Sequence, residues 1–147
     1  MSALRELGDS SLRAEVMEDI GSYGVTSTQQ RFLEQKSPDG EGWEKSSRAK
    51  SKGGQTLRDR GNLFDSLTYS ADSNSVAWGT NLIYAAIHQY GGEIKAKNGG
   101  KLKFKVGGHF VQVDKVDMPA RPYLGLTDED EAEITDIVQL RLSEVFQ

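Results

Sequence analysis

The side chains that most often carry chemistry are few and scattered in this chain of 147 residues, which contains no cysteine and two histidines, His88 and His109. A metal site needs three or four converging ligands, and neither histidine has a carboxylate or a second histidine at helical or hairpin spacing. We therefore expect a packed or hydrogen-bonded structural role for His88. We expect an exposed position for His109, at a glycine turn. The sequence predicts no metal site and no cofactor.

The carboxylates form a dense cluster near the C-terminal end of the chain. Its members are Asp128, Glu129, Asp130, Glu131, Glu133 and Asp136. Such a cluster could serve as general acid–base machinery, but carboxylates in the first turn of a helix also complement the helix dipole. Thr127 and Asp130 have the spacing of a shortened capping box. We favour the structural interpretation, so no catalytic residue is predicted and the chain is not expected to be an enzyme.

Positive charge gathers in residues 45–60. The positively charged residues of this segment are Lys45, Arg48, Lys50, Lys52, Arg58 and Arg60, and its one acidic residue is Asp59. Phosphate binding is the less favoured interpretation, because no aromatic residues are interleaved with these cations. The lysine, serine and glycine composition of residues 45–54 is typical of a mobile, solvated loop. The net charge of −4 is too small to direct the whole protein to nucleic acid or membrane.

The glycines and serines match no catalytic template. Gly99-Gly100 and Gly107-Gly108 are turn glycines and fit neither a phosphate loop nor a dinucleotide fingerprint. No serine lies in a nucleophile elbow. No apolar run approaches the roughly 18–20 residues of a membrane span, and no signal-peptide core follows Met1. We therefore expect a soluble protein that stays where it is made.

The elements that position these residues begin with a helix over residues 9–35. Apolar residues recur there at helical period, namely Leu12, Val16 and Ile20. Gly21 and Gly24 each weaken a helix by about 1 kcal/mol relative to alanine. Either the helix kinks at these glycines or two helices meet there.

The rest of the chain alternates short helices with hairpins. The pattern predicts a turn at 37–40, a short helix at 60–67, a hairpin of 68–71 with 75–79, a short helix at 84–90, a hairpin of 102–106 with 110–113, a stiff extended segment at 118–125 and a helix after Thr127. This order indicates an α+β fold. The N-terminal and C-terminal helices pack on a small antiparallel sheet with a projecting β-hairpin, within one domain over residues 1–147.

The aromatic residues are interpreted as packing groups. Trp43 stands alone in a polar loop, so we expect it to anchor that loop to the body of the domain. The same core role, rather than a ligand cage, is predicted for Trp78, Tyr84 and Tyr90.

Arg121 lies between Ala120 and Pro122, which fix its approach to a partner. One interpretation is a bidentate contact with a carboxylate of another subunit. The other is a local pair that fastens the loop within one subunit, and the sequence leaves both open.

Four pieces of the sequence, taken together, resemble the phage virion morphogenesis family, which includes tail-completion proteins of contractile-tailed phages and G proteins of Mu-like phages. They are R-F at 31–32 with S-P-D-G at 37–40 and Trp43, R-G-N-L at 60–63 with S-L, V-A-W-G-T-N at 76–81 leading into Y-A-A-I-H-Q-Y-G-G at 84–92, and P-A-R-P-Y-L-G at 119–125 with the acidic helix. They occur in the family's order and cover nearly the whole chain beyond the first helix. The departures are modest, since the family often has threonine at the position of Arg60 and phenylalanine at Tyr90 or Tyr123.

The resemblance implies a structural virion protein that acts in tail completion or head–tail joining. It implies a homo-oligomeric ring, a hexamer matching the symmetry of the tail. The implied partners are the tail tube and neck or head-connector proteins, with no membrane, catalysis or cofactor. The implied location is the tail–head junction of the virion, and the host cytoplasm during assembly.

Opposite charge on residues 45–60 and on the C-terminal helix suits a head-to-tail interface that closes into a ring. The interface and structural candidates are Trp43, Arg58, Arg60, Trp78, Tyr84, His88, Tyr90, Arg121, Tyr123, Asp128 and Asp130.

The alternative function is a nucleic-acid-binding module whose residues 45–60 and 95–105 contact packaged DNA in the neck channel, although the negative net charge disfavours it. A cell-wall hydrolase is a third class, but the converging catalytic set that it needs is not evident in the sequence.

Overall fold

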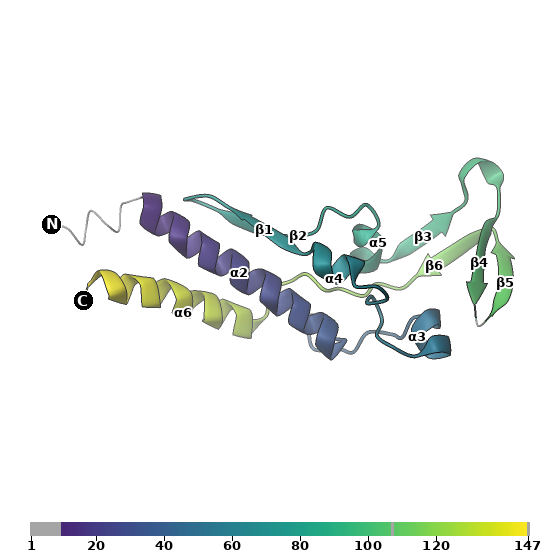
Figure 1. Ribbon diagram of the computed structural model, residues 1–147, viewed down its shortest axis with the longest axis horizontal. Coiled ribbons are helices and arrows are strands. Elements are labelled where there is room, and N and C mark those ends of the chain that lie inside the picture. Colours follow the sequence, from purple (N-terminus) through teal and green to yellow (C-terminus); the bar gives the residue numbers. More distant parts are fainter. Residues whose placement is uncertain (1–9, 107, 147) are drawn as a thin grey trace. The chain divides into compact units, whose positions relative to one another are not determined.

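The computed structural model describes residues 10–106 and 108–146, and it has the mixed helical and strand content of the predicted α+β class (Figure 1). The described residues gather into two compact units. Unit 1 contains residues 10–30, 67–80 and 126–146, and unit 2 contains residues 31–66 and 81–125. The single-domain assignment over residues 1–147 stays a prediction. Within the described ranges, no helix is both long enough and apolar enough to cross a membrane.

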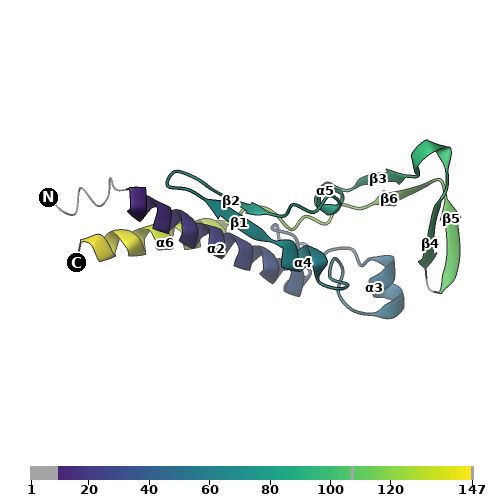
Figure 2. The ribbon, with the colours of Figure 1, turned by 45° about the horizontal axis from the view of Figure 1, so that its top comes forward.

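Unit 1 is built on α2 (Ser10–Glu34), an uninterrupted helix of 25 residues whose last turn belongs to unit 2. A hairpin of β1 (Thr68–Ala71) and β2 (Val76–Gly79) confirms the predicted strands. The helix α6 (Asp128–Val145) completes the unit. Figure 1 shows α2 running between the β1–β2 hairpin and α6, and Figure 2 shows the hairpin running along α2.

The two glycines of α2 do not break the helix, because each leaves room for an aromatic ring of the hairpin. A Cβ at Gly21 would lie 2.3 Å from Cδ2 of Tyr69, and a Cβ at Gly24 would lie 2.3 Å from Cδ2 of Trp78. The predicted kink or helix junction is therefore wrong. Close packing of the rings offsets the low helix propensity of glycine, a tertiary effect that local spacing does not reveal.

Polar contacts join α6 to α2. The Nε of Arg141 donates a hydrogen bond of 2.8 Å to Asp19, and its Nη1 lies 3.4 Å from Glu15. Two leucines of α6 stay exposed, however, with Leu142 at 37% and Leu140 at 60% of full exposure. In the described part of α6, the one buried residue is Asp130.

Unit 2 surrounds a buried phenylalanine. Phe32 is fully buried, and its ring meets those of Trp43, Phe64 and Tyr123 at centroid distances of 5.4, 5.9 and 5.5 Å. Its helices are α3 (Ser47–Lys52), α4 (Asn62–Ser66), α5 (Ala85–Tyr90) and the 3₁₀ turn η1 (Lys97–Gly99). Its strands are β3 (Gly92–Lys95) paired with β6 (Lys115–Met118), and β4 (Leu102–Val106) paired with β5 (His109–Val113). Figure 1 shows β3 and β6 leading from α5 to the β4–β5 hairpin.

Two expectations about secondary structure need correction. The described strands form three separate two-stranded antiparallel ladders rather than one small sheet, and the β3–β6 pair was not predicted. Residues 45–54, expected to be a mobile loop, contain α3. The Ser46 hydroxyl accepts from the Ala49 N–H, and Ala49 is 6% exposed, so a cap and one buried methyl group define a helix in a polar segment.

The packing of Trp78 on α2 can be tested with Gly24→Ala. Helix propensity alone would stabilise the variant by about 1 kcal/mol. We expect instead a lower free energy of unfolding, by about 1–3 kcal/mol, because the new methyl group overlaps the Trp78 ring. Urea unfolding followed by far-ultraviolet circular dichroism measures this, with Ser22→Ala, at an exposed position of the same helix, as the control. A Gly24→Ala variant as stable as Ser22→Ala would contradict the packing.

Candidate functional site

An extended segment, residues 119–125, crosses unit 2 and is held there by buried groups. Tyr123 is 1% exposed, and its hydroxyl donates to the carbonyl of Ala85 at 3.1 Å. The indole N–H of Trp43 donates to the Pro122 carbonyl at 2.8 Å, which confirms the predicted anchoring role of Trp43. Arg31 donates to the Tyr123 carbonyl at 2.8 Å. The segment therefore has a fixed path and can present side chains in defined directions.

Gln89 of α5, which sequence reasoning missed, completes this attachment. Its side-chain oxygen accepts from the N–H groups of Tyr123 and Leu124, both at 3.0 Å, and its side-chain nitrogen donates to the Leu124 carbonyl at 3.0 Å. One amide thus satisfies three backbone groups of a segment that belongs to no strand. The position of Gln89 within the Y-A-A-I-H-Q-Y-G-G piece was the one sequence feature that could have indicated this role.

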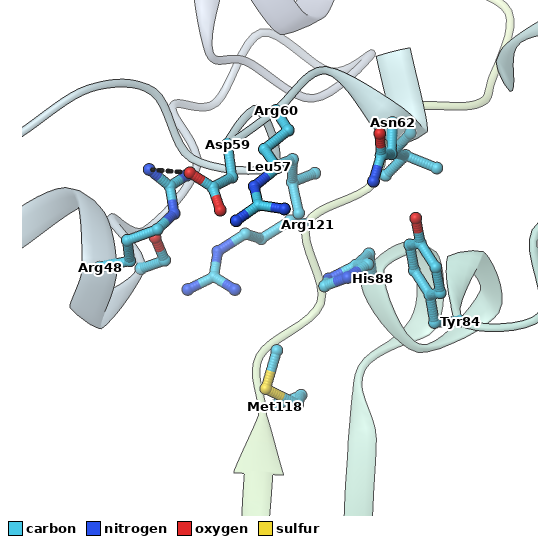
Figure 3. Close-up of a pocket in the computed structure, with 11 residues that line it drawn as sticks. Arg48, Leu57, Asp59, Arg60, Asn62, Tyr84, His88, Met118 and Arg121 are labelled. Atoms are coloured by element: carbon cyan, nitrogen blue, oxygen red, sulfur yellow. Dashed lines mark ion pairs between the residues drawn. The ribbon is translucent and has the colours of Figure 1, made fainter. Parts of the chain in front are cut away.

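A pocket of about 290 Å³ opens between α3, α4, α5 and the extended segment (Figure 3). We call it the arginine pocket. Its lining residues are Ser46, Arg48, Leu57, Asp59, Arg60, Asn62, Leu63, Tyr84, His88, Met118 and Arg121. Three arginines line it against a single carboxylate, that of Asp59, which lies 3.6 Å from Nη1 of Arg48. The arginine pocket therefore carries a net positive charge and suits an anion.

Arg121 is the most deeply placed of these arginines, at 4% exposure. Its Nε donates to the Glu44 carbonyl at 2.7 Å, and its backbone N–H donates to the His88 carbonyl at 2.7 Å. Burial lowers the pKa of Arg121, and the nearby charge of Glu44 acts in the opposite direction. The local contact that was one of the two sequence interpretations is therefore present. A contact with another subunit stays a prediction.

His88 borders the arginine pocket from α5 and is half-buried. Burial, followed by the positive charge of Arg121, lowers the pKa of His88 below its ordinary value and so favours the neutral imidazole. Its Nδ1 is buried without a hydrogen-bond partner among the residues that the structure describes. The ring of Tyr84 lies edge-on to the imidazole of His88, with 6.2 Å between the ring centroids. The other histidine, His109, is exposed as expected.

Tyr84 and Tyr90 do not lie in the core, contrary to expectation. Their exposures are 46% and 79%, and that of the neighbouring Ile83 is 99%. The inward face of α5 is formed by Ala85, which is 5% exposed, and Gln89, four residues later. The two tyrosines lie outside this face, so α5 presents aromatic and aliphatic surface to solvent next to the arginine pocket.

Among the remaining candidates, Arg58 and Trp78 pack against residues of their own unit, whereas Arg60 is exposed. The guanidinium of Arg58 lies 4.4 Å from the centre of the Phe64 ring, and its Nη1 donates to Gln55. Trp78 is half-buried against Gly24 in unit 1. Arg60 is exposed and lines the arginine pocket. Of the two arginines, Arg60 is thus the one placed for an external partner.

The predicted capping box at the start of α6 is present. The Thr127 hydroxyl accepts from the Asp130 N–H at 2.9 Å, and the Asp130 carboxylate accepts from the Thr127 N–H at 3.0 Å. The other carboxylate oxygen of Asp130 accepts from the hydroxyls of Tyr23 at 2.7 Å and Ser27 at 2.6 Å, on α2. Asp130 is 4% exposed, whereas Asp128 lies at the surface.

The environment of Asp130 shifts two pKa values in opposite directions. Burial alone would raise the pKa of Asp130, but hydrogen bonds from Ser27, Thr127 and Tyr23 outweigh it and lower the pKa to about 2. Burial, and then the hydrogen bond to Asp130, raises the pKa of Tyr23 to about 12. An ionised Asp130 is therefore a structural group that joins α6 to α2.

The arrangement supports binding of anions and of other surfaces. Among residues 10–106 and 108–146, no group of three or more histidine, aspartate or glutamate side chains could hold a metal ion. The features with an evident capacity for partners are the arginine pocket, the exposed surface of α5 and the exposed start of α6.

The chain is similar to known proteins both at the level of a family and at the level of individual relatives. A model of the phage virion morphogenesis family matches residues 2–143. The chain is 36% identical over 139 residues to Mu-like prophage FluMu G protein 2 of Haemophilus influenzae, covering 94% of this chain and 85% of that protein. It is 32% identical, over an alignment of 152 positions, to a G protein of Escherichia phage Mu that is provisionally assigned to capsid assembly, covering 96% of this chain and 86% of that protein. No solved structure matches.

The pH dependence of stability tests the role of Asp130. Because the pKa of Asp130 is about 2 in the folded chain, below its ordinary value of 3.8, the ionised group stabilises the fold above about pH 4. We expect this contribution, about 2 kcal/mol, to be lost as the pH falls towards 2. Urea unfolding between pH 7 and pH 2.5 should show the loss in the wild type and a smaller one in Asp130→Asn, which should also be less stable at pH 7. Asp128→Asn, at the exposed neighbouring carboxylate, is the control, and equal pH profiles for all three proteins would refute this role.

Proposed function

The chain belongs to the phage virion morphogenesis family, and from this premise we propose that it acts as a structural subunit in tail completion and head–tail joining. In this proposal the subunits form a homo-oligomeric ring, a hexamer that matches the symmetry of the tail. The ring lies at the tail–head junction and contacts the tail tube on one side and neck or head-connector proteins on the other. It performs no catalysis.

The observation that carries this proposal is the amount of apolar surface that one subunit leaves uncovered. Ile83 at 99% and Tyr90 at 79% exposure lie at α5, and Leu140 and Phe146 are 60% and 61% exposed at α6. Exposed apolar surface of this kind often marks an interface with other proteins. The uncovered residues lie on both units, as expected for a subunit that meets more than one neighbour.

The name of the phage Mu relative points to the capsid, whereas the resemblance to tail-completion proteins points to the tail. The two functions differ in what accumulates when the protein is missing. A capsid assembly factor is needed before heads form. A tail-completion protein is needed only after heads and tails have formed separately.

Electron microscopy of particles made without this chain distinguishes these functions. We expect normal heads that are not joined to tails, together with tails of irregular length, and restoration of joined particles when the gene is supplied in trans. Native mass spectrometry of the purified protein should show a species of six times the 16.2 kDa chain mass. Absent or malformed heads alongside normal tails would contradict the proposal and indicate a function in capsid assembly instead.

A second candidate function is contact with packaged DNA, favoured by the exposed lysines Lys101 and Lys103 on and beside β4. Binding to phosphates weakens with salt, by roughly 0.9 log unit per log unit of salt for each phosphate contact. Duplex binding measured by fluorescence anisotropy from 50 to 200 mM salt would show this slope in the wild type and a shallower one in Lys101→Gln/Lys103→Gln. An affinity independent of salt would exclude the function.

A further inference from the structure

The arginine pocket of unit 2 and the first turn of α6 carry opposite charge and expose neighbouring apolar groups. We propose that the arginine pocket of one copy binds the acidic first turn of α6 of a second copy, through the exposed carboxylates of Asp128, Glu129 and Glu131. This inference rests on the proposed self-assembly and names the two surfaces that meet. Since the surfaces differ, the contact is head-to-tail, the kind that repeats around a closed ring.

The arginine pocket has unused capacity for a carboxylate. A guanidinium carries five N–H donors, and the hydrogen bond from Nε of Arg121 to the Glu44 carbonyl uses one of them. In the described part of the chain, no carboxylate lies within ion-pair distance of Arg121 or Arg60. Arg48 is paired to Asp59 and the charge of Glu44 lies near Arg121, but the three arginines still leave the pocket lining positively charged for an incoming anion.

The position of Arg121 makes a bound carboxylate favourable. The side chain is 4% exposed, so its charge is poorly hydrated, and the extended segment holds it in place from both sides. A carboxylate that reaches a partly desolvated guanidinium gains more than it would at an open surface. His88 adds a buried Nδ1 without a partner among the described residues, at the wall of the same pocket.

The first turn of α6 has the matching features. Asp130 is turned inward and is used by Tyr23, Ser27 and Thr127. The other carboxylates of the turn, on Asp128, Glu129 and Glu131, are exposed and make no ion pair within residues 10–106 and 108–146. The capping box fixes the backbone of the turn, so these side chains leave it in defined directions.

Apolar surface accompanies the charge on both sides. Leu126, one residue before the cap of α6, is 55% exposed. Ile83 and Tyr84 are 99% and 46% exposed, and Tyr84 also lines the arginine pocket. A turn that inserts carboxylates into the pocket can therefore lay Leu126 against these side chains, which excludes water from the charged contacts.

The size of the pocket favours protein side chains over nucleic acid. A volume of about 290 Å³ accepts one or two carboxylate side chains, whereas a duplex presents a continuous line of phosphates along a groove.

Cross-linking tests the contact directly, because the natural chain has no cysteine. One protein carries Asn62→Cys, at an exposed position of the pocket lining, and a second, mass-tagged protein carries Ala132→Cys, at an exposed position of the first α6 turns. After mixing and mild oxidation, we expect a dimer that contains one chain of each kind. Lys50→Cys, exposed on α3 outside the pocket lining, replaces Asn62→Cys in the control and should give less than about one fifth of the product.

Charge reversal tests the chemistry of the same contact. Arg60→Glu should raise the dissociation constant of the assembly about ten-fold or more, as followed by sedimentation velocity at low salt, and Glu129→Arg in the same chain should recover much of the loss. Lys50→Glu makes an equal change of charge outside the pocket and should leave assembly unchanged. A circular dichroism spectrum of each variant confirms that it is folded.

The outcomes separate this inference from the proposed function. A hexamer that forms normally in Arg60→Glu and gives no cross-link between positions 62 and 132 overturns the pocket contact and leaves the ring intact. The cross-link without a closed hexamer supports the contact and contradicts the ring. A wild-type chain that stays monomeric at every concentration and gives no cross-link overturns both. Loss of DNA binding in Arg60→Glu together with normal assembly assigns the pocket to phosphates instead.

Discussion

The burial of Tyr123 is the constraint on which unit 2 depends. Its ring packs on Phe32, its hydroxyl reaches the start of α5, and its backbone groups are held by Arg31 and Gln89. These contacts join pieces far apart in the sequence and keep residues 119–125 extended, with no strand beside them. Arg121, two residues before Tyr123, is therefore held inside the arginine pocket by the same contacts, and so is the wall that α5 supplies. Anything that displaced the Tyr123 ring would change the pocket as well as the core.

Unit 1 depends on a different kind of contact, in which aromatic rings of the β1–β2 hairpin pack against glycines of α2. Gly21 and Gly24 bring the rings of Tyr69 and Trp78 onto the backbone of α2. A single buried carboxylate, that of Asp130, fixes the start of α6 on the same helix. Aromatic rings and hydrogen bonds thus attach the hairpin and α6 to α2, while Leu140 and Leu142 of α6 stay exposed.

The sequence predicted the features that are set by neighbours along the chain. Helical period located α2 and α6, alternation located the β1–β2 and β4–β5 hairpins, and the Thr127–Asp130 spacing located the capping box. It did not predict β3 and β6, because these strands do not pair with a neighbour along the chain but across another hairpin. The arginine pocket could not be predicted from the sequence either, because the lining residues come from several separate stretches of the chain. Tyr84 and Tyr90 show the same limit. Their type suggests a core, but the packing face of α5 belongs to Ala85 and Gln89.

The capping box at the start of α6 has a consequence for kinetics. Since Thr127 and Asp130 satisfy each other's backbone N–H groups, the acidic turn is ordered before it meets any other molecule. In the proposed contact, association through a preorganised turn would lose little conformational entropy, so its rate would be governed by how often two copies collide in a suitable orientation. Long-range attraction between unlike charges raises that frequency, and dissolved ions screen it. The ionic strength of the host cell would then set the pace at which subunits add to one another.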